Sequence, residues 1–593
     1  MLLHHQERES RPTYAEPIEV ERAPGQSSLA ALLILAALPL IAGAWALMSP
    51  KLVVLQEMPW DLLFNLAGAW HLHSGHVQHV DFHEPVGQLN FLLTQAGFHV
   101  VGPSPRAFLV GTIIMAVIVY LCAAFAAWHR LPLTASVIFV TFITLLVLMP
   151  ANVGDKPDIY SFAMSYNRYG WSILSVIAFI LFLPPSDRSS SGISAMAAVA
   201  GLTLVLFHLK ITYFAVALAA VVLAVLVSPH IRRSWLSWAA IVALATLYAL
   251  AKPNWPYLSD LMNAAANGGV RSGIHYHVNK IFHQPLEAAT YTAAVVVAIW
   301  LWVSGRAPLR LPAAVCFLVV SGVLLLSQNA QSHGLPVGII IVFLLYGQLM
   351  EPRRPRSQAV APLMLVALLV FPITNAGAAA LSLAGYWQKA ASGSGLYVIH
   401  DTRLEGLAVP SQSDDLLSAF AGVEVGFPLL NRARTISPRY ELSSSEYVST
   451  LVEAADFLRA RSSPGGRIVV LDQVNPLPFM LGILPARGEN LWSGLGAPVQ
   501  PAEKLFADSE HVLIPKFSTY SAWTDQAVRL YGPYIFKHFP SRQETRSWIK
   551  FSRSPHDHLG PSVRVDESAL ATPNESRGPL PGASRPLAVS RVR

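Results

Sequence analysis

Long apolar runs separated by short polar gaps occupy the first two thirds of the chain. A helix needs about 20 apolar residues to cross the core of a bilayer, and shorter runs serve where neighbouring helices pack around them. The pattern therefore predicts a polytopic helical bundle. The eleven predicted spans are 29–49, 107–128, 132–150, 169–184, 193–208, 211–228, 236–251, 288–304, 311–327, 335–349 and 358–377.

Every second gap between these spans is basic. The arginines in those gaps are Arg130, Arg188, Arg232, Arg233, Arg306, Arg310, Arg353, Arg354 and Arg356. By the positive-inside rule these gaps face the cytoplasm. We therefore expect a multi-pass protein of a bacterial inner (plasma) membrane, with a cytoplasmic tail at 1–28 and a transmembrane domain at 29–384.

The first span has a second interpretation, because "AWA" at 44–46 is typical of a signal-peptidase site after an apolar segment. The polar leader is long, however, and contains Glu as well as Arg, and the apolar run is long for a signal peptide. These features favour a retained span. The N-terminus is then cytoplasmic, and an odd number of crossings places the chain from about 385 onward outside.

The outer face carries the long connections, which are the predicted loops 50–106, 151–169 and 252–287. Beyond them, strand and helix patterns alternate over residues 385–555, which predicts a periplasmic α/β domain. Its clearest signals are the strands "GLYVIHD", "RIVVLD" and "HVLIPKF", and the helix 443–461 opened by a capping box of Ser443 and Glu446. The Pro, Ser, Arg and Gly-rich tail 556–593 is predicted to be disordered.

Composition supports this fold class, an α-helical polytopic membrane protein with a C-terminal α/β extracytoplasmic domain. The chain is 53% hydrophobic and only 13% charged, and its net charge of +7 comes from arginines in short gaps. We therefore expect membrane lipids and no nucleic acid as partners. The two cysteines, Cys122 and Cys316, lie inside apolar spans, which argues against a disulfide framework or a Cys-based zinc site.

The first external loop combines membrane-seeking residues with carboxylates, as in "EMPWDLLFNLAGAW" (57–70). Apolar residues recur at helical spacing over 60–70, and 89–101 is a second short apolar segment, so two helices lying in the membrane interface are predicted. Asp61 begins the first of them. It either satisfies the helix dipole or acts as a catalytic base near the membrane surface.

The stretch "DFHEPVGQL" (81–89), followed by "GPSPRAFLVG" (102–111) at the second span, resembles the GT-C superfamily of integral-membrane glycosyltransferases. Its members include protein mannosyltransferases and bacterial aminoarabinose transferases, which use polyprenyl-phosphate sugars as donors. The family's essential acidic residue in the first external loop is matched by Asp61. Its "FEKPPL" stretch aligns an acidic residue with Glu84, although the following lysine is absent here.

Two cationic positions are candidates for the donor's lipid phosphate. Arg168, beside Tyr166 in "SYNRYGW", stands at the edge of the fourth span, where a buried arginine needs a polar cavity or an anion unless it snorkels to the headgroups. The sequence "HLK" at 208–210 interrupts the long apolar run 193–228, so that two short helices meeting there would bring His208 and Lys210 to the outer face. They form either a phosphate site or a plain turn between two helices.

Other polar side chains gather in the same external loops. Asp81, Asp155 and Asp158 are candidates for metal or acceptor contacts. The first loop is also rich in histidine, at His71, His73, His76, His79 and His83, but in no recognised zinc spacing. Because some members of the resembling family use a divalent cation, Mg²⁺ or Mn²⁺ held by acidic groups and the donor phosphate is the cofactor that the resemblance suggests.

The leading hypothesis is an inverting transfer of a sugar from a polyprenyl-phosphate donor to an envelope glycan, lipid or protein on the periplasmic face. Asp61 would act as the base, and Glu84 is a second, weaker candidate. Arg168 and Lys210 would stabilise the leaving phosphate. The alternatives are a transporter or lipid flippase, which should show repeated halves and broken helices, and a noncatalytic component of polysaccharide assembly.

Overall fold

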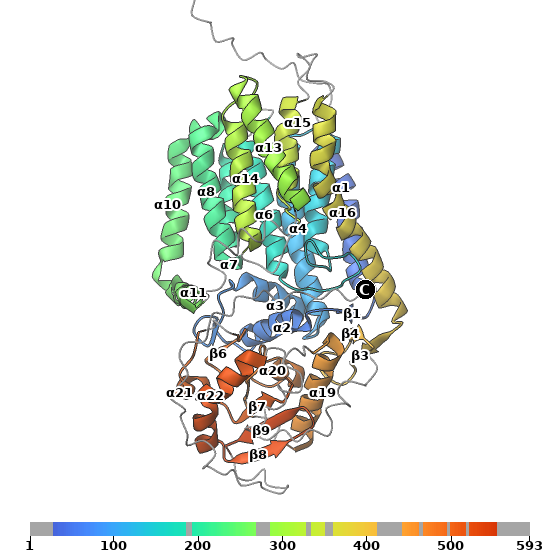
Figure 1. Cartoon of the computed structure of the whole chain (residues 1–593), viewed down its shortest axis with the longest axis vertical. Helices are drawn as coiled ribbons and strands as arrows, with labels where there is room; N and C mark the ends of the chain where they lie inside the picture. Colours follow the sequence, from blue (N-terminus) through green and yellow to red (C-terminus); the bar gives the residue numbers. More distant parts are fainter. Residues whose placement is uncertain are drawn as a thin grey trace, which may run out of the picture.

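The computed structural model describes residues 28–185, 192–267, 285–327, 334–349, 360–411, 442–461, 466–494, 498–517 and 521–553. They form a mostly helical molecule with three tiers (Figure 1): a long helical bundle, a middle layer of two helices, and an α/β part. The predicted tails lie outside the described residues apart from Ser28, as do Arg188 and the arginines at 353, 354 and 356.

Each of the eleven predicted spans coincides with a helix of the bundle. The helices are α1 (Leu29–Met48), α4 (Arg106–Trp128), α5 (Leu133–Leu148), α6 (Ser165–Phe182), α7 (Ile193–Leu209), α8 (Ile211–Val227), α10 (Trp235–Leu250), α13 (Pro285–Val303), α14 (Arg310–Ser327), α15 (Gly338–Leu349) and α16 (Val360–Ser392). Among the described residues, α1, α4, α13 and α14 are long and apolar enough to cross a membrane by themselves. The protein is therefore a membrane protein, and eleven crossings remains a prediction.

The burial of each helix indicates its position in the bundle. α1 begins at Ser28, whose hydroxyl accepts a hydrogen bond from the Ala31 N–H at 3.0 Å, and it exposes Ile34 and Leu38 where lipid would contact the protein. α6 is the opposite case, since every residue except Tyr166 is buried. A helix that is buried all round is the central element of a bundle. Its polar first turn is therefore held inside the protein.

The last bundle helix differs from the sequence prediction. α16 continues to Ser392, well past the predicted end at residue 377, so the predicted domain boundary at 384/385 falls within a helix. Apolar residues of its later turns, such as Leu383 and Tyr386, are buried against the rest of the protein. Packing below the bundle therefore extends the helix beyond its apolar run, and α16 leads directly into the first strand of the α/β part.

The middle tier consists of α2 (Pro59–His73) and α3 (Leu89–Val101), which confirms two helices in the first external loop. α2 does not lie open on a surface, because the α/β part covers it (Figure 1). The Trp70 indole donates a hydrogen bond to the Ile483 carbonyl at 2.8 Å, and the Phe64 ring meets the Trp492 ring edge-on at 5.6 Å. These contacts bury most of α2.

The α/β part contains three small sheets and includes strands from the first external loop. β1 (Val53–Val54) pairs with β4 (Leu407–Pro410), which also pairs with β3 (Leu396–Val398), and β2 (Phe82–His83) pairs with β6 (Glu489–Asn490). The third sheet has the order β5-β7-β9-β8. Its strands are β5 (Ile468–Val470), β7 (His511–Pro515), β9 (Trp548–Ser552) and β8 (Ser541–Glu544). Two segments that are far apart in the sequence thus form one structural unit.

The three predicted strands correspond to β3, β5 and β7. The predicted capping box is confirmed at α19 (Ser444–Arg461), where the Ser443 N–H donates to the Glu446 carboxylate at 2.8 Å and the Glu446 N–H donates to the Ser443 hydroxyl at 3.3 Å. Among the described residues of this part, the other helices are α20 (Leu477–Leu481), α21 (Ala502–Leu505) and α22 (Ser521–His538).

The segment 252–287, predicted to be a loop between two spans, is helical in its first half. A single 3-10 turn (Lys252–Asn254) leads into α11 (Trp255–Asn267), which bends away from α10 by 56°. α9 (Pro229–Arg232) is a short connection between α8 and α10. Residues 268–284 lie outside the described residues. The α11 helix matters because two of its side chains, Tyr257 and Asp260, are buried.

Candidate functional site

Asp61 lies where α2 and α6 begin next to each other. Its carboxylate accepts a hydrogen bond from the backbone N–H of Met164, the residue that precedes α6. It does not cap its own helix, because Met58 occupies the N-cap of α2 without a side-chain hydrogen bond. Asp61 therefore lies in the first turn of α2 and also contacts the start of the neighbouring helix α6.

The backbone at both helix starts is in an unusual conformation. Met58 and Met164 have φ angles of +51° and +48°, in the left-handed region that non-glycine residues rarely adopt. With His79, at +67°, they are the positive-φ residues other than glycine among the residues that the structure describes. Strained conformations of this kind cluster at functional sites. All three belong to the segments that surround the candidate site.

Burial raises the pKa of the Asp61 carboxyl to about 7, and the hydrogen bond from Met164 acts in the opposite direction. The residue remains partly exposed. A general base is most effective when its pKa lies near the working pH. Asp61 therefore has the protonation behaviour that suits proton transfer at neutral pH.

Lys210 reaches the same first turn of α6 from another direction. It stands at the break between α7 and α8 with an extended backbone, and its ammonium group donates a hydrogen bond to the Asn167 side-chain oxygen at 3.1 Å. The ammonium also lies 4.9 Å from the centre of the Tyr166 ring. Asp61, Tyr166 and Lys210, all predicted site residues, are therefore brought together around one helix start.

Two further residues of this cluster were missed by the sequence analysis. Asn167 and Tyr213 are both 0% exposed, yet the Asn167 amide nitrogen and the Tyr213 hydroxyl have no hydrogen-bond partner. Buried polar atoms without a partner are rare and call for an explanation. Asn167 lies within the quoted motif "SYNRYGW", and its position beside Tyr166 was the only available signal. A bound polar group would satisfy both atoms.

Glu84 is held against the break between α7 and α8. The Gly87 N–H donates to the Leu209 carbonyl at 3.1 Å, and a Cβ at Gly87 would lie 2.1 Å from the His208 carbonyl oxygen. The Glu84 carboxylate accepts a hydrogen bond from the Val86 N–H at 3.4 Å. Burial, and then the charge of Asp260, raise the pKa of Glu84 to about 8.

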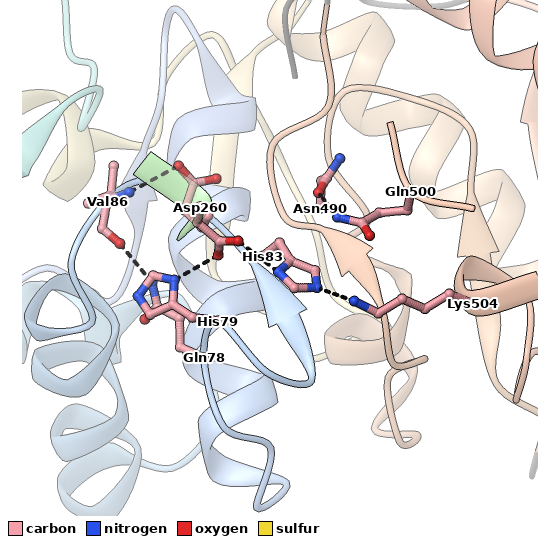
Figure 2. Close-up of polar contacts among 9 residues, drawn as sticks. Gln78, His79, His83, Val86, Asp260, Asn490, Gln500 and Lys504 are labelled. Atoms are coloured by element: carbon pink, nitrogen blue, oxygen red, sulfur yellow. Dashed lines mark hydrogen bonds and ion pairs between the residues drawn. The ribbon is translucent and has the colours of Figure 1, made fainter. Parts of the chain in front are cut away.

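Asp260 of α11 lies between two histidines of the first loop (Figure 2). Its two carboxylate oxygens are 2.8 Å from His79 Nδ1 and 3.0 Å from His83 Nδ1. On the other side of His83, Nε2 is 3.0 Å from the ammonium group of Lys504 in the α/β part. This series of contacts joins α11, the first loop and the α/β part.

Arg168 and His208 have their nearest partners elsewhere. Arg168 is 0% exposed and donates hydrogen bonds to the Ala151 carbonyl at 2.9 Å and the Ala163 carbonyl at 3.5 Å, so it braces the external segment 151–163. The His208 ring shares a 2.7 Å hydrogen bond with the Tyr248 hydroxyl on α10. Their expected roles in phosphate binding stay predictions.

The three remaining acids stand in separate places. Asp81 accepts a hydrogen bond from the Val77 N–H at 2.8 Å and lies 3.5 Å from Arg487, so it shapes its own turn. Asp155 lies in the segment braced by Arg168, and Asp158 is exposed. Among the described residues, no three His, Cys, Asp or Glu side chains are grouped so as to hold a metal ion. The divalent cation remains a prediction that these residues do not support by themselves.

Most histidines of the first loop make contacts between segments. His71 is 1% exposed, and its Nε2 lies 2.8 Å from the Glu489 carboxylate of β6. Its Nδ1 lies 3.1 Å from His76 Nδ1, and burial followed by the nearby His71 lowers the pKa of His76 to about 4. These buried contacts fix the α/β part to the first loop.

A scan of protein-family models and a search of curated proteins each found no match. Similar solved structures include ArnT from Cupriavidus metallidurans bound to undecaprenyl phosphate, with 12% identity and a TM-score of 0.40 over 90% of this chain and 100% of that chain. The apo form of ArnT gives 10% and 0.39 over 90% and 99%. AglB from Archaeoglobus fulgidus, in complex with an inhibitory peptide and a dolichol-phosphate, gives 10% and 0.30 over 89% and 74%. Similarity at this level does not decide the activity, which the site itself must support.

Proposed function

We propose that this chain is an inverting glycosyltransferase that moves a sugar from a polyprenyl-phosphate donor to an acceptor on the outer side of the membrane. One observation carries the proposal. A carboxylate with a pKa near 7, Asp61, and a cation, Lys210, both meet the first turn of α6. Beside them lie the unsatisfied polar atoms of Asn167 and Tyr213.

The chemistry follows from these groups. Asp61 takes the proton of the acceptor hydroxyl, the hydroxyl oxygen forms a bond to the anomeric carbon, and the bond from that carbon to the phosphate oxygen breaks. A positioned base of this kind contributes about 10² to 10⁴ in rate. Because the attack and the departure occur on opposite faces of the sugar, the anomeric configuration inverts.

The leaving phosphate is matched by positive charge and by helix starts. Lys210 provides a cation at the N-terminus of α8, and the adjacent N-terminus of α6 adds the positive end of a second helix dipole. The Asn167 amide is an unused donor at the same place. Charge that develops on the phosphate oxygens would therefore be stabilised without rearrangement of the protein.

An apolar groove suits the donor's hydrocarbon tail. It has a volume of about 580 Å³ and is open along one side between α8 and α14, where Thr212, Val216, Ala219, Phe317, Val320 and Leu324 line it. Thr212 is two residues from Lys210, so the groove begins beside the phosphate position. A lipid with its phosphate at Lys210 would place its first isoprene units in this groove.

The acceptor is proposed to be an envelope glycan, lipid or protein reached from the periplasmic face. The segments around Asp61 that would contact it are the first loop, α11 and the α/β part. Arg168 supports the site indirectly by holding segment 151–163, and a divalent cation would have to be coordinated mainly by the donor phosphate. A flippase needs a polar path between halves, whereas the polar groups here are gathered at one end of the bundle.

Replacing Lys210 with methionine should weaken the binding of bare polyprenyl phosphate roughly 10- to 100-fold, the range expected when a hydrogen bond to a charged group is lost. The measurement is binding to the full-length protein in lipid nanodiscs. Lys156→Met is the matched control, because Lys156 is exposed in segment 151–163, and it should bind like the unaltered protein. Equal affinities for the two variants would contradict a phosphate site at Lys210.

A further inference from the structure

We propose that Glu84 and Tyr257 bind hydroxyl groups of the donor's sugar, and that Asp260 positions this pair. The inference rests on the proposed function and names the part of the site that recognises the sugar. Tyr257 and Asp260 belong to α11, in a segment that the sequence pattern predicted to be a loop. Neither residue carried a functional prediction.

Unsatisfied atoms give the first reason. Glu84 is 4% exposed and Tyr257 5%, yet the Glu84 Oε2 oxygen and the Tyr257 hydroxyl have no well-aligned hydrogen-bond partner. The backbone N–H of Trp492 lies near the Glu84 carboxylate, and that of Ile211 lies near the Tyr257 hydroxyl. The Gln78 side-chain oxygen, 3% exposed, is a third such atom, and the Gln78 amide is fixed to the Val86 carbonyl at 2.7 Å. Leaving a buried polar group unpaired costs about 1–3 kcal/mol. A ligand with several hydroxyl groups would remove this cost.

Location gives the second reason. The Tyr257 ring packs edge-on against Phe207 of α7 at 5.4 Å, and its hydroxyl lies beside the backbone N–H of Ile211, the first residue of α8. Gly87 holds the segment that carries Glu84 against Leu209. Glu84 and Tyr257 therefore both lie beside the break between α7 and α8, which is where Lys210 stands. Because the sugar is bonded directly to the donor phosphate, it must lie next to that residue.

The protonation state of Glu84 and the charge of Asp260 indicate which class of sugar this pair can bind. Burial and the nearby Asp260 keep the pKa of Glu84 above neutral pH, so the carboxyl group is mostly protonated and offers both a donor and an acceptor. A sugar hydroxyl has the same two capacities. A carboxylated sugar would face the negative charge of Asp260, which is unfavourable. The pair therefore fits the hydroxyl groups of a sugar that carries no carboxylate.

Asp260 contacts the two histidines that lie next to this pair, His79 and His83 (Figure 2). A lysine ammonium can only donate, so His83 Nε2 accepts from Lys504 and His83 Nδ1 carries the proton that it donates to Asp260. His79 contacts the other Asp260 oxygen, and its ring stacks on Tyr257 at 4.6 Å. Asp260 touches no substrate in this account. It fixes α11, and with it the Tyr257 hydroxyl, beside Glu84.

The test measures binding to the full-length protein in nanodiscs. The probes are bare polyprenyl phosphate and the same lipid carrying glucose, mannose, galactose or arabinose. With the tightest-binding sugar lipid, Tyr257→Phe and Glu84→Ala should each weaken binding about tenfold, as for one lost hydrogen bond, and leave the bare lipid unchanged. Glu84→Gln should stay close to the unaltered protein, because the amide is neutral and keeps a donor and an acceptor. Thermal stability of Tyr257→Phe should fall little, since the hydroxyl has no well-aligned hydrogen-bond partner in the protein.

The ratio of the two affinities is the deciding readout. Asp260→Asn should lower the sugar-lipid affinity relative to the bare lipid, a change that general destabilisation would not produce. The inference is overturned if no sugar lipid binds more tightly than the bare lipid, if Tyr257→Phe weakens both lipids equally or neither, or if Glu84→Gln behaves like Glu84→Ala. Lys210→Met, which should weaken both lipids, tests the phosphate site separately.

Discussion

Replacing Asp61 with asparagine is expected to lower the rate of sugar transfer by about 10² to 10⁴, the contribution of a positioned general base. The amide can still accept the hydrogen bond from the Met164 N–H, so the starts of α2 and α6 should keep their structure. The measurement is the release of polyprenyl phosphate from a sugar-bearing lipid by the purified full-length protein. Thermal stability should remain close to that of the unaltered protein.

Asp158→Asn is the matched control for this substitution. Asp158 lies in the same set of predicted external loops, and its side chain is exposed. Its activity should stay within about twofold of the unaltered protein, as is usual for surface substitutions. If Asp61→Asn retained comparable activity, Asp61 would not be the base.

Replacing Gly87 with alanine should lower kcat/KM about 100-fold, because a displacement of about 1 Å in a site can have this effect. The added Cβ would lie 2.1 Å from the His208 oxygen and 2.4 Å from its carbonyl carbon, and neither backbone atom can turn aside. The segment that carries Glu84 must then move away from the break between α7 and α8. The same lipid-release assay measures the effect.

Gly201→Ala provides the comparison for the glycine substitution. Gly201 lies in the interior of α7, and a Cβ there meets nothing within 4 Å. Alanine is favoured over glycine in a helix by about 1 kcal/mol, so this variant should be at least as stable and fully active. Unchanged activity in Gly87→Ala would show that close packing of residues 84–87 on the break is not needed.

The bundle was predictable because its signals are local. Apolar length and alternating basic gaps are read along the chain, and a helix lies at every predicted span. The end of α16 was not predictable, since residues beyond 377 gain helical structure from packing below the bundle. α11 was missed because the segment begins with prolines, as in "KPNWPYL" (252–258).

Parts of the site could also be read from the sequence. Asp61 follows a span in a position that the resemblance marks, and Lys210 interrupts an apolar run, so both stood out. Their contact through α6 depends on the fold. The contacts of Arg168 with the Ala151 and Ala163 carbonyls could not be predicted from the sequence, because these residues become its neighbours only when segment 151–163 folds back.

Contacts between residues that are far apart in the sequence could not be predicted. Asp260 meets His79 and His83 over more than 170 positions, and His83 meets Lys504 over 421. Each residue alone is an ordinary polar residue of an external segment. The left-handed backbone of Met58 and Met164 is equally invisible, since methionine has no preference for it. The proposed pairing of Glu84 with Tyr257 could therefore be recognised only in the structure.

The most direct test of the proposed transfer is the lipid-linked sugar pool of cells that lack this protein. Deletion should cause a polyprenyl-phosphate sugar to accumulate in the membrane, as measured by mass spectrometry, because the donor is no longer consumed. The unaltered gene should restore the normal level, and the Asp61→Asn variant, produced in equal amount, should not. A normal lipid-linked sugar pool in the deletion strain, or full restoration by Asp61→Asn, would contradict the account.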